Sequence, residues 1–171
     1  IFSILLVLAL AGAAFAQPVN IDFWHAMTGK NATMVQTIAD NFNATQTAYK
    51  VTPVFKGTYS DTMNAGIAAF RAGTPPAILQ VFEVGTATMM SAKGAIKPVY
   101  QLMKEQGEKF DPKAYIPTIT GYYSTAKGEM LSLPFNSSST VMWINKDALK
   151  KAGLNPDAPP RTWPEVFEAA K

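Results

Sequence analysis

The sequence has 171 residues and a net charge of +3, which comes from 15 basic and 12 acidic residues; it contains one histidine and no cysteine. The absence of cysteine excludes a fold held together by disulfides. A nucleic-acid-binding protein needs clustered basic residues, and because this chain has no dense basic run, no nucleic-acid partner is predicted.

The first sixteen residues, "IFSILLVLALAGAAFA", are apolar and uncharged and end in small side chains. The triplet Ala14-Phe15-Ala16 matches an A-x-A cleavage site, so we expect residues 1–16 to be a partial signal peptide. A membrane anchor is the alternative, but the apolar run is shorter than the ~20 residues that a spanning helix needs. No cysteine stands at the cleavage site to carry a lipid anchor. The segment therefore predicts a soluble periplasmic protein.

Strand and helix patterns alternate over the next part of the chain. "VNIDFWH" (19–25) and "YKVTPVF" (49–55) are strand-like, and Pro53 favours an edge or a bend for the second. Apolar residues then recur at helical spacing, and we expect these stripes to be buried. The stripe residues are Met34, Val35, Ile38 and Phe42 in the first helix, and Met63, Ile67 and Phe70 in the second.

"PPAILQVFE" (75–83) is a continuous apolar run, which is typical of a strand buried on both faces of a parallel sheet. The order strand, helix, strand, helix, strand predicts an α/β domain.

Four residues share a position in this pattern. Trp24, His25, Tyr59 and Glu83 each lie at or just after the carboxyl end of a predicted strand. In open α/β sheets, ligands bind at these ends. Glu83 is also the one acidic residue in an apolar and small-residue run, and burying a lone carboxylate is costly. The shared position favours a ligand cleft at Glu83 over a strand end that only faces water.

The remaining segments are shorter. We expect two short helices between Gly85 and Gly107, an irregular stretch over 110–130 with a turn at Lys127-Gly128, and two strands, "MLSLPF" (130–135) and "STVMWIN" (139–145). A short helix follows and ends at Gly153. The last helix begins with a T-x-x-E capping box at Thr162 and Glu165, and no stop signal precedes Lys171, so the chain is expected to be a fragment.

Catalytic and metal-binding signatures are absent from the sequence. The single histidine excludes an H-x-x-x-H metal motif, and no phosphate-binding glycine loop occurs. Ser137–Ser139 does not lie in a G-x-S-x-G elbow. A hydrolase that uses Glu83 would need a second positioned carboxylate, and neither Asp22 nor Asp61 has a recognisable context. The sequence favours binding over catalysis, with a secreted hydrolase using Glu83 or Ser137–Ser139 as the alternative.

Several segments carry a family resemblance, chiefly "AGIAAFRAGTPPAILQVFEVGTATMM", "LPFNSSSTVMWINKDALKKAGL" and "PPRTWPEV". They resemble the amino-terminal part of extracellular solute-binding proteins of family 1, in the glycerol-3-phosphate-binding branch that serves Ugp-type ABC importers. The resemblance implies a two-lobed fold of the type II periplasmic-binding-protein class. It assigns residues 17–136 to the first α/β lobe. Residues 137–171 would form a crossover and the start of a truncated second lobe, with "LPFNSSS" as the first crossing.

The resemblance also implies a site and partners. Ligand contacts carry over to Tyr59, Glu83 and Ser138, while Trp24 and His25 are possible neighbours of the ligand. For Trp24, packing in the core or at the hinge explains the residue as well as contact with the ligand does. For His25, a structural hydrogen bond is a better explanation than contact with the ligand. The implied ligand is glycerol 3-phosphate or a glycerophosphodiester such as glycerophosphocholine, and an oligosaccharide is the alternative within the same fold.

The implied protein is a monomer without metal or cofactor that delivers its ligand to a membrane permease and its ATPase. Ser139-Thr140 stands where a Thr-Pro pair is expected, and one residue is inserted near Gly94; neither change touches a carried-over position. The sequence offers no obvious cation to pair with a phosphate. The resemblance implies that an arginine plays this role, in the carboxy-terminal part of the family's sequence that this chain does not include.

Overall fold

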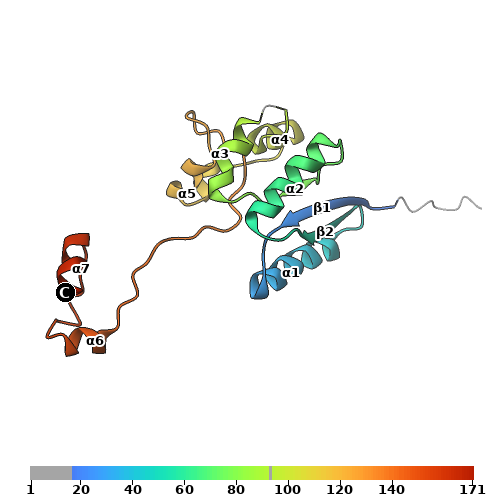
Figure 1. The fold of residues 1–171 in the computed structure, drawn as a ribbon. Helices are drawn as coiled ribbons and strands as arrows, with labels where there is room; N and C mark the ends of the chain where they lie inside the picture. The colour runs from blue at the N-terminus through green and yellow to red at the C-terminus, as the bar shows by residue number, and fades with distance from the viewer. Residues whose placement is uncertain (1–16, 93) are drawn as a thin grey trace, which may run out of the picture. The chain divides into compact units, whose positions relative to one another are not determined.

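The computed structural model describes residues 17–92 and 94–171, which divide into two compact units (Figure 1). The first unit ends at Phe135 and the second runs from Asn136 to Lys171. The expected signal peptide, residues 1–16, lies outside the described residues. Among the helices that are described, none is long and apolar enough to cross a membrane.

The first unit is built on a parallel sheet of β1 (Val19–His25), β2 (Tyr49–Phe55) and β3 (Ile78–Leu79), in the order β2-β1-β3. All seven residues of β1 pair with β2, whereas only Phe23 and Trp24 pair with β3. The α/β order is therefore confirmed. Pro53 lies in the edge strand β2, as predicted, where a residue without an N–H group is tolerated.

Helix α1 (Gly29–Thr45) connects β1 to β2 and packs on β2. Its buried residues are Val35 and Ala39. The prediction that its whole stripe is buried is wrong, since Met34, Ile38 and Phe42 are 59%, 55% and 42% exposed.

A side-chain contact accounts for the orientation of α1. The Asn43 amide nitrogen donates to the Val51 carbonyl oxygen (2.9 Å), and the Asn43 side-chain oxygen accepts from the Val51 N–H (2.8 Å). This pair of bonds occupies backbone groups of the edge strand β2 and fixes which side of the helix faces the sheet.

Helix α2 (Tyr59–Arg71) connects β2 to β3 and begins with a capping box. The Thr58 hydroxyl accepts from the Asp61 N–H, and the Asp61 carboxylate accepts from the Thr58 N–H (2.9 Å) and hydroxyl (2.7 Å). These hydrogen bonds hold the pKa of Asp61 below its ordinary value. Gly66 lies against Leu79, where a Cβ atom would come within 2.5 Å of a Leu79 methyl carbon, so a glycine lets α2 approach β3 closely.

The third strand is shorter and more open than predicted. The run 75–83 was expected to be a strand buried on both faces, but only Ile78 and Leu79 are strand, and Ile78 is 45% exposed. A strand extends only as far as its neighbours pair with it, and among the described residues β3 has one partner, β1. The chain then passes through residues 80–82 into α3 (Glu83–Ser91).

The rest of the first unit contains α4 (Val99–Gln106), the 3-10 helix η1 (Pro112–Ala114) and α5 (Pro117–Tyr122). The two short helices α3 and α4 confirm the prediction for this region. The turn at Lys127-Gly128 is also confirmed: Gly128 has φ +81° and donates its N–H to the Thr125 carbonyl oxygen (2.9 Å). The expectation of an irregular 110–130 stretch is wrong over η1 and α5.

The second unit contains α6 (Lys146–Lys151) and α7 (Trp163–Ala169), and both begin as the sequence predicts. The Asn145 side chain caps α6, and Thr162 with Glu165 forms the expected capping box of α7. The strands predicted at 130–135 and 139–145 are wrong, since neither segment is a strand. β-structure depends on a paired neighbour: in 130–135 only Met130 pairs, in an isolated antiparallel bridge with Ser124, and no described strand pairs with 139–145.

Candidate functional site

The carboxyl edge of the sheet is held together by two backbone hydrogen bonds beyond the ends of the strands. The Lys56 N–H donates to the His25 carbonyl oxygen (3.0 Å), and the Gln80 N–H donates to the Trp24 carbonyl oxygen (2.9 Å). These bonds continue the parallel ladders on both sides of β1. They therefore bring the segments that follow β2 and β3 alongside the end of β1, where ligands of such sheets bind.

Tyr59 and Glu83 occupy equivalent positions beyond this edge. Tyr59 is the first residue of α2, and Glu83 is the first residue of α3, so both lie at helix starts and not at strand ends. The ring of Tyr59 stacks on Phe82, with ring centroids 5.6 Å apart and 12° between their planes. Because Phe82 precedes Glu83 directly, the structure brings Tyr59 and Glu83 into one cluster.

The Glu83 backbone is fixed while its side chain is exposed. The Tyr122 hydroxyl donates to the Glu83 carbonyl oxygen (2.6 Å). The buried Gly85 packs closely on Met63 of α2, so a Cβ atom there would require the Met63 side chain to move. A carboxylate in the first turn of a helix also has a favourable interaction with the helix dipole. Glu83 is thus a positioned anionic acceptor that faces solvent.

Trp24 lies at the same edge, half-buried, beneath a cation. The Nζ atom of Lys56 is 3.8 Å from the centroid of the Trp24 ring, which is a cation–π contact. One face of the ring is therefore occupied by a residue of this chain.

His25 is in a different situation, because it is only 4% exposed. Its Nδ1 atom accepts a hydrogen bond from the Met27 N–H (3.2 Å), and its ring lies near those of Phe23 and Phe55. Burial lowers the pKa of His25, which favours the neutral ring that this acceptor role requires. The geometry supports the structural hydrogen bond over contact with a ligand.

Ser138 lies in the second unit, exposed and outside any helix or strand. Its place beside a ligand stays a prediction.

The structure adds three residues that the sequence did not single out: Lys56, Phe82 and Tyr122. All three are at the edge or in contact with Tyr59 or Glu83. The contact between Glu83 and Tyr122 joins residues 39 positions apart. No local pattern reveals such a contact, although Lys56 could have been noticed from its place directly after β2.

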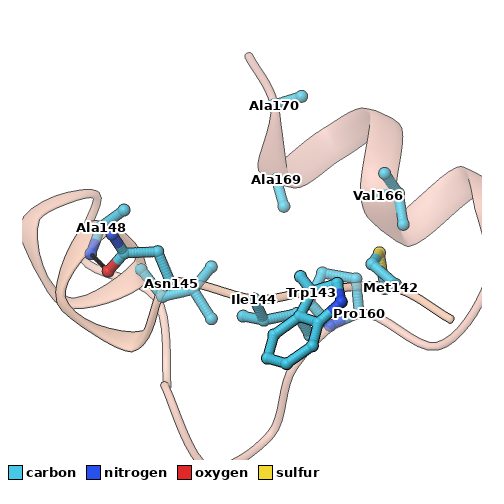
Figure 2. Close-up of a pocket in the computed structure, with 10 residues that line it drawn as sticks. Met142, Trp143, Ile144, Asn145, Ala148, Pro160, Val166, Ala169 and Ala170 are labelled. Carbon is cyan, nitrogen blue, oxygen red and sulfur yellow. Dashed lines mark hydrogen bonds between the residues drawn. The ribbon is translucent and has the colours of Figure 1, made fainter. Parts of the chain in front are cut away.

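The second unit has an apolar hollow of its own, between α6, α7 and the segment before α6 (Figure 2). Met142, Trp143, Ile144 and Val166 line it, and the one polar side chain in the lining, Asn145, is engaged in capping α6. This chemistry suits packing against other apolar groups and not a polar ligand. In the described residues, no group of three His, Asp or Glu side chains could hold a metal ion.

Comparisons with known proteins place the chain in a family. A sequence model of the bacterial extracellular solute-binding protein family matches residues 26–171. The chain is 57% identical, over 152 residues, to the sn-glycerol-3-phosphate-binding periplasmic protein UgpB of Rhizobium meliloti (strain 1021). That match covers 89% of this chain and 35% of the relative, so the chain spans about a third of the relative's length.

Two solved structures share the fold. UgpB from Mycobacterium tuberculosis, in complex with glycerophosphocholine, matches with a TM-score of 0.69 and 21% identity, over 88% of this chain and 38% of that one. The cyclic alpha-maltosyl-1,6-maltose binding protein from Arthrobacter globiformis matches with a TM-score of 0.65 and 22% identity, over 89% and 37%. The chain belongs to the bacterial extracellular solute-binding protein family. The expected fold class is also confirmed: the described α/β structure matches part of the two-lobed fold of these proteins.

Proposed function

We propose that this chain, a member of the bacterial extracellular solute-binding protein family, belongs to the solute-binding component of an ABC importer. That component captures sn-glycerol 3-phosphate or a glycerophosphodiester in the periplasm and delivers it to the membrane permease and its ATPase. The observation that carries the proposal is the cluster of Tyr59 and Glu83 at the carboxyl edge of the sheet. It occurs in a chain 57% identical to a protein named for binding this phosphoester.

The chemistry of the cluster suits such a ligand. Glycerol hydroxyls are hydrogen-bond donors, and the exposed carboxylate of Glu83 is a strong acceptor for them. Phosphate oxygens need donors, which the hydroxyls of Tyr59 and Ser138 supply together with backbone N–H groups. Tyr59 is held by its stack on Phe82, so its hydroxyl is positioned before the ligand arrives.

The capture step requires two lobes. We assign residues 17–136 to the first lobe and residues 137–171 to the crossover and the start of the second. In a two-lobed binding protein, closure about a hinge buries the ligand between both faces of the cleft. The relatives are binding proteins, and we infer that this protein is likewise not an enzyme: it releases its ligand unchanged and acts as a monomer.

Calorimetry on the full-length protein tests the proposal. Here, full-length means this sequence together with the remainder that its relatives carry. Glycerol 3-phosphate, glycerophosphocholine and maltotriose are titrated separately, and we expect binding of at least one phosphoester and none of maltotriose. Mass spectrometry of the released ligand should show it intact. Binding of maltotriose alone would favour the oligosaccharide alternative, and a cleaved phosphoester would favour the hydrolase.

A further inference from the structure

We propose that Lys56 is the cation with which the first unit contacts the phosphate group of the ligand; this inference rests on the proposed function. Lys56 directly follows β2, and its N–H group is bonded to the His25 carbonyl oxygen. That bond fixes the Lys56 backbone at the carboxyl edge of the sheet. The side chain therefore starts from a defined point beside the cluster of Tyr59 and Glu83.

The ammonium group is held by a ring, and no carboxylate among the described residues forms an ion pair with it. Nζ lies 3.8 Å from the centroid of the Trp24 ring, and Lys56 is half-buried. The ion pairs among the described residues involve Lys97, Lys146 and Lys171. Lys56 is not one of them. The nearby Asp61 carboxylate is engaged by Thr58 in the capping box. A cation held on one side by an aromatic face can still donate its N–H groups to an anion on the other.

A tight turn ties Lys56 to Tyr59. Gly57 has φ +96°, and a Cβ atom there would lie 2.8 Å from the Asp61 carboxylate oxygen, so both the backbone conformation and the close approach require glycine. The turn leads through Thr58 into α2, whose first residue is Tyr59. The position of Lys56 is thus coupled to the start of α2, and the edge offers a cation and a hydroxyl for phosphate together with a carboxylate for glycerol.

Two other lysines of the first unit provide controls. Lys50 lies near the start of β2, at the opposite end of the strand from Lys56. Lys30 lies at the carboxyl edge, in the first turn of α1, but it is exposed. Neither has a cation–π contact among the described residues. If only net charge matters, replacing any of the three lysines should have the same effect.

The test uses the full-length protein and isothermal calorimetry with glycerol 3-phosphate at low and high salt. Lys56→Met keeps the apolar stem on Trp24 and removes the charge, and we expect about five- to fifty-fold weaker binding together with a smaller salt dependence. Lys56→Arg keeps a cation over the ring and should stay within about three-fold of wild type. Lys50→Met and Lys30→Met should stay within about two-fold.

The outcomes separate this inference from the proposed function. If the wild type binds glycerol 3-phosphate and Lys56→Met binds as tightly as Lys50→Met does, the inference is wrong and the function stands. A lower melting temperature with unchanged affinity would show that Lys56 only supports Trp24, and would also overturn the inference. If the wild type binds no phosphoester, both are wrong. Loss of affinity in Lys56→Met with recovery in Lys56→Arg is the supporting result.

Discussion

The two units are held together in different ways. The first unit has a sheet with helices packed on it and buries Val35, Ala39, Thr62 and Met130. In residues 136–171 no residue is buried, and Trp143 and Trp163 are 93% and 83% exposed. Each unit nevertheless has a helix that begins with a capping box, α2 at Thr58 and α7 at Thr162.

Helix caps and a hydrophobic core therefore stabilise structure independently of each other. A cap satisfies backbone N–H groups within one turn, so it needs no distant partner. A core needs apolar faces from several elements, and Trp143 and Val166 in the second unit face a hollow instead (Figure 2). The relatives are almost three times as long as the matched region, and we propose that their remaining sequence supplies the missing faces.

The strongest test compares this chain alone with the full-length protein. Residues 17–171 expressed alone should bind glycerol 3-phosphate far more weakly than the full-length protein, by more than about a hundred-fold, because several hydrogen bonds from the opposite face of the cleft are lost. Calorimetry on both proteins measures the difference. Comparable affinities would show that residues 17–171 bind the ligand without the remainder of the protein and that the two-lobed cleft is wrong.

Glu83→Gln in the full-length protein is expected to have the next largest effect. The change keeps the shape and one acceptor oxygen but removes the charge and adds a donor where the ligand presents donors of its own. Losing a charge-assisted hydrogen bond costs about 1.5–3 kcal/mol, a ten- to hundred-fold loss of affinity. The melting temperature should hold, because the Glu83 side chain is exposed.

The matched control is Glu105→Gln on α4, which removes an exposed carboxylate paired with Lys97. That variant should leave affinity unchanged. Tighter binding of Glu83→Gln would place the carboxylate beside the phosphate, where it repels the ligand, and would contradict its role as an acceptor for glycerol hydroxyls.

How far the sequence predicts the structure depends on the range of the interactions. The cap at Thr162 and the turn at Gly128 come from neighbouring residues, and the local pattern predicts the start of α7 and the turn itself. The capping box at Thr58 is just as local, although it was not among the predictions. Pro53 also favours an edge or a bend for its strand, and β2 lies at the edge of the described sheet. Patterns of this kind predicted the α/β order of the first unit.

Long-range partners are what the local pattern does not contain. The apolar segment 139–145 reads as a strand, but no described strand pairs with it. The local pattern predicts that the apolar stripe of α1 is buried. The hydrogen bonds between Asn43 and Val51 instead orient the helix so that another face contacts the sheet. At the site, the pattern placed Tyr59 and Glu83 near one edge, while the stack on Phe82 and the bond from Tyr122 required the fold.

Tyr59→Phe and Ser138→Ala each remove one hydroxyl, the first from the first unit and the second from the second unit. Each should weaken glycerol 3-phosphate binding by about 1.5 kcal/mol, roughly ten-fold, because each removes a donor to a charged phosphate. Tyr59→Phe keeps the stack on Phe82, so stability should hold. Tyr115→Phe, whose ring lies near Phe110, is the control. A fall in melting temperature with unchanged affinity would make both hydroxyls structural.

The two capping boxes allow the same change to be made in both units. Thr58→Ala and Thr162→Ala should each lower the free energy of unfolding by about 1 kcal/mol, measured by urea denaturation of the full-length protein. Only Thr58→Ala should also weaken ligand binding, because its helix begins with Tyr59. Equal losses of affinity in the two variants would remove this link between the cap and the site.

The smallest expected effect is a pH dependence that belongs to the first unit, since His25 is the one histidine of the sequence. Burial lowers the pKa of His25 from its ordinary value of 6.5. The unfolded chain therefore takes up a proton at a higher pH than the folded chain does, and stability falls as the pH drops below 6.5, down to the folded-state pKa. His25→Asn removes the titrating group and keeps an acceptor for the Met27 N–H. Urea denaturation of the full-length protein between about pH 8 and pH 5 gives the free energy of unfolding of wild type and variant as a function of pH. The two curves should be parallel above pH 6.5 and should converge or cross below it, because only the wild type loses stability as His25 becomes protonated in the unfolded chain. Curves that stay parallel throughout would mean that His25 titrates as it does in the unfolded chain, and that its burial carries no cost for the charged ring.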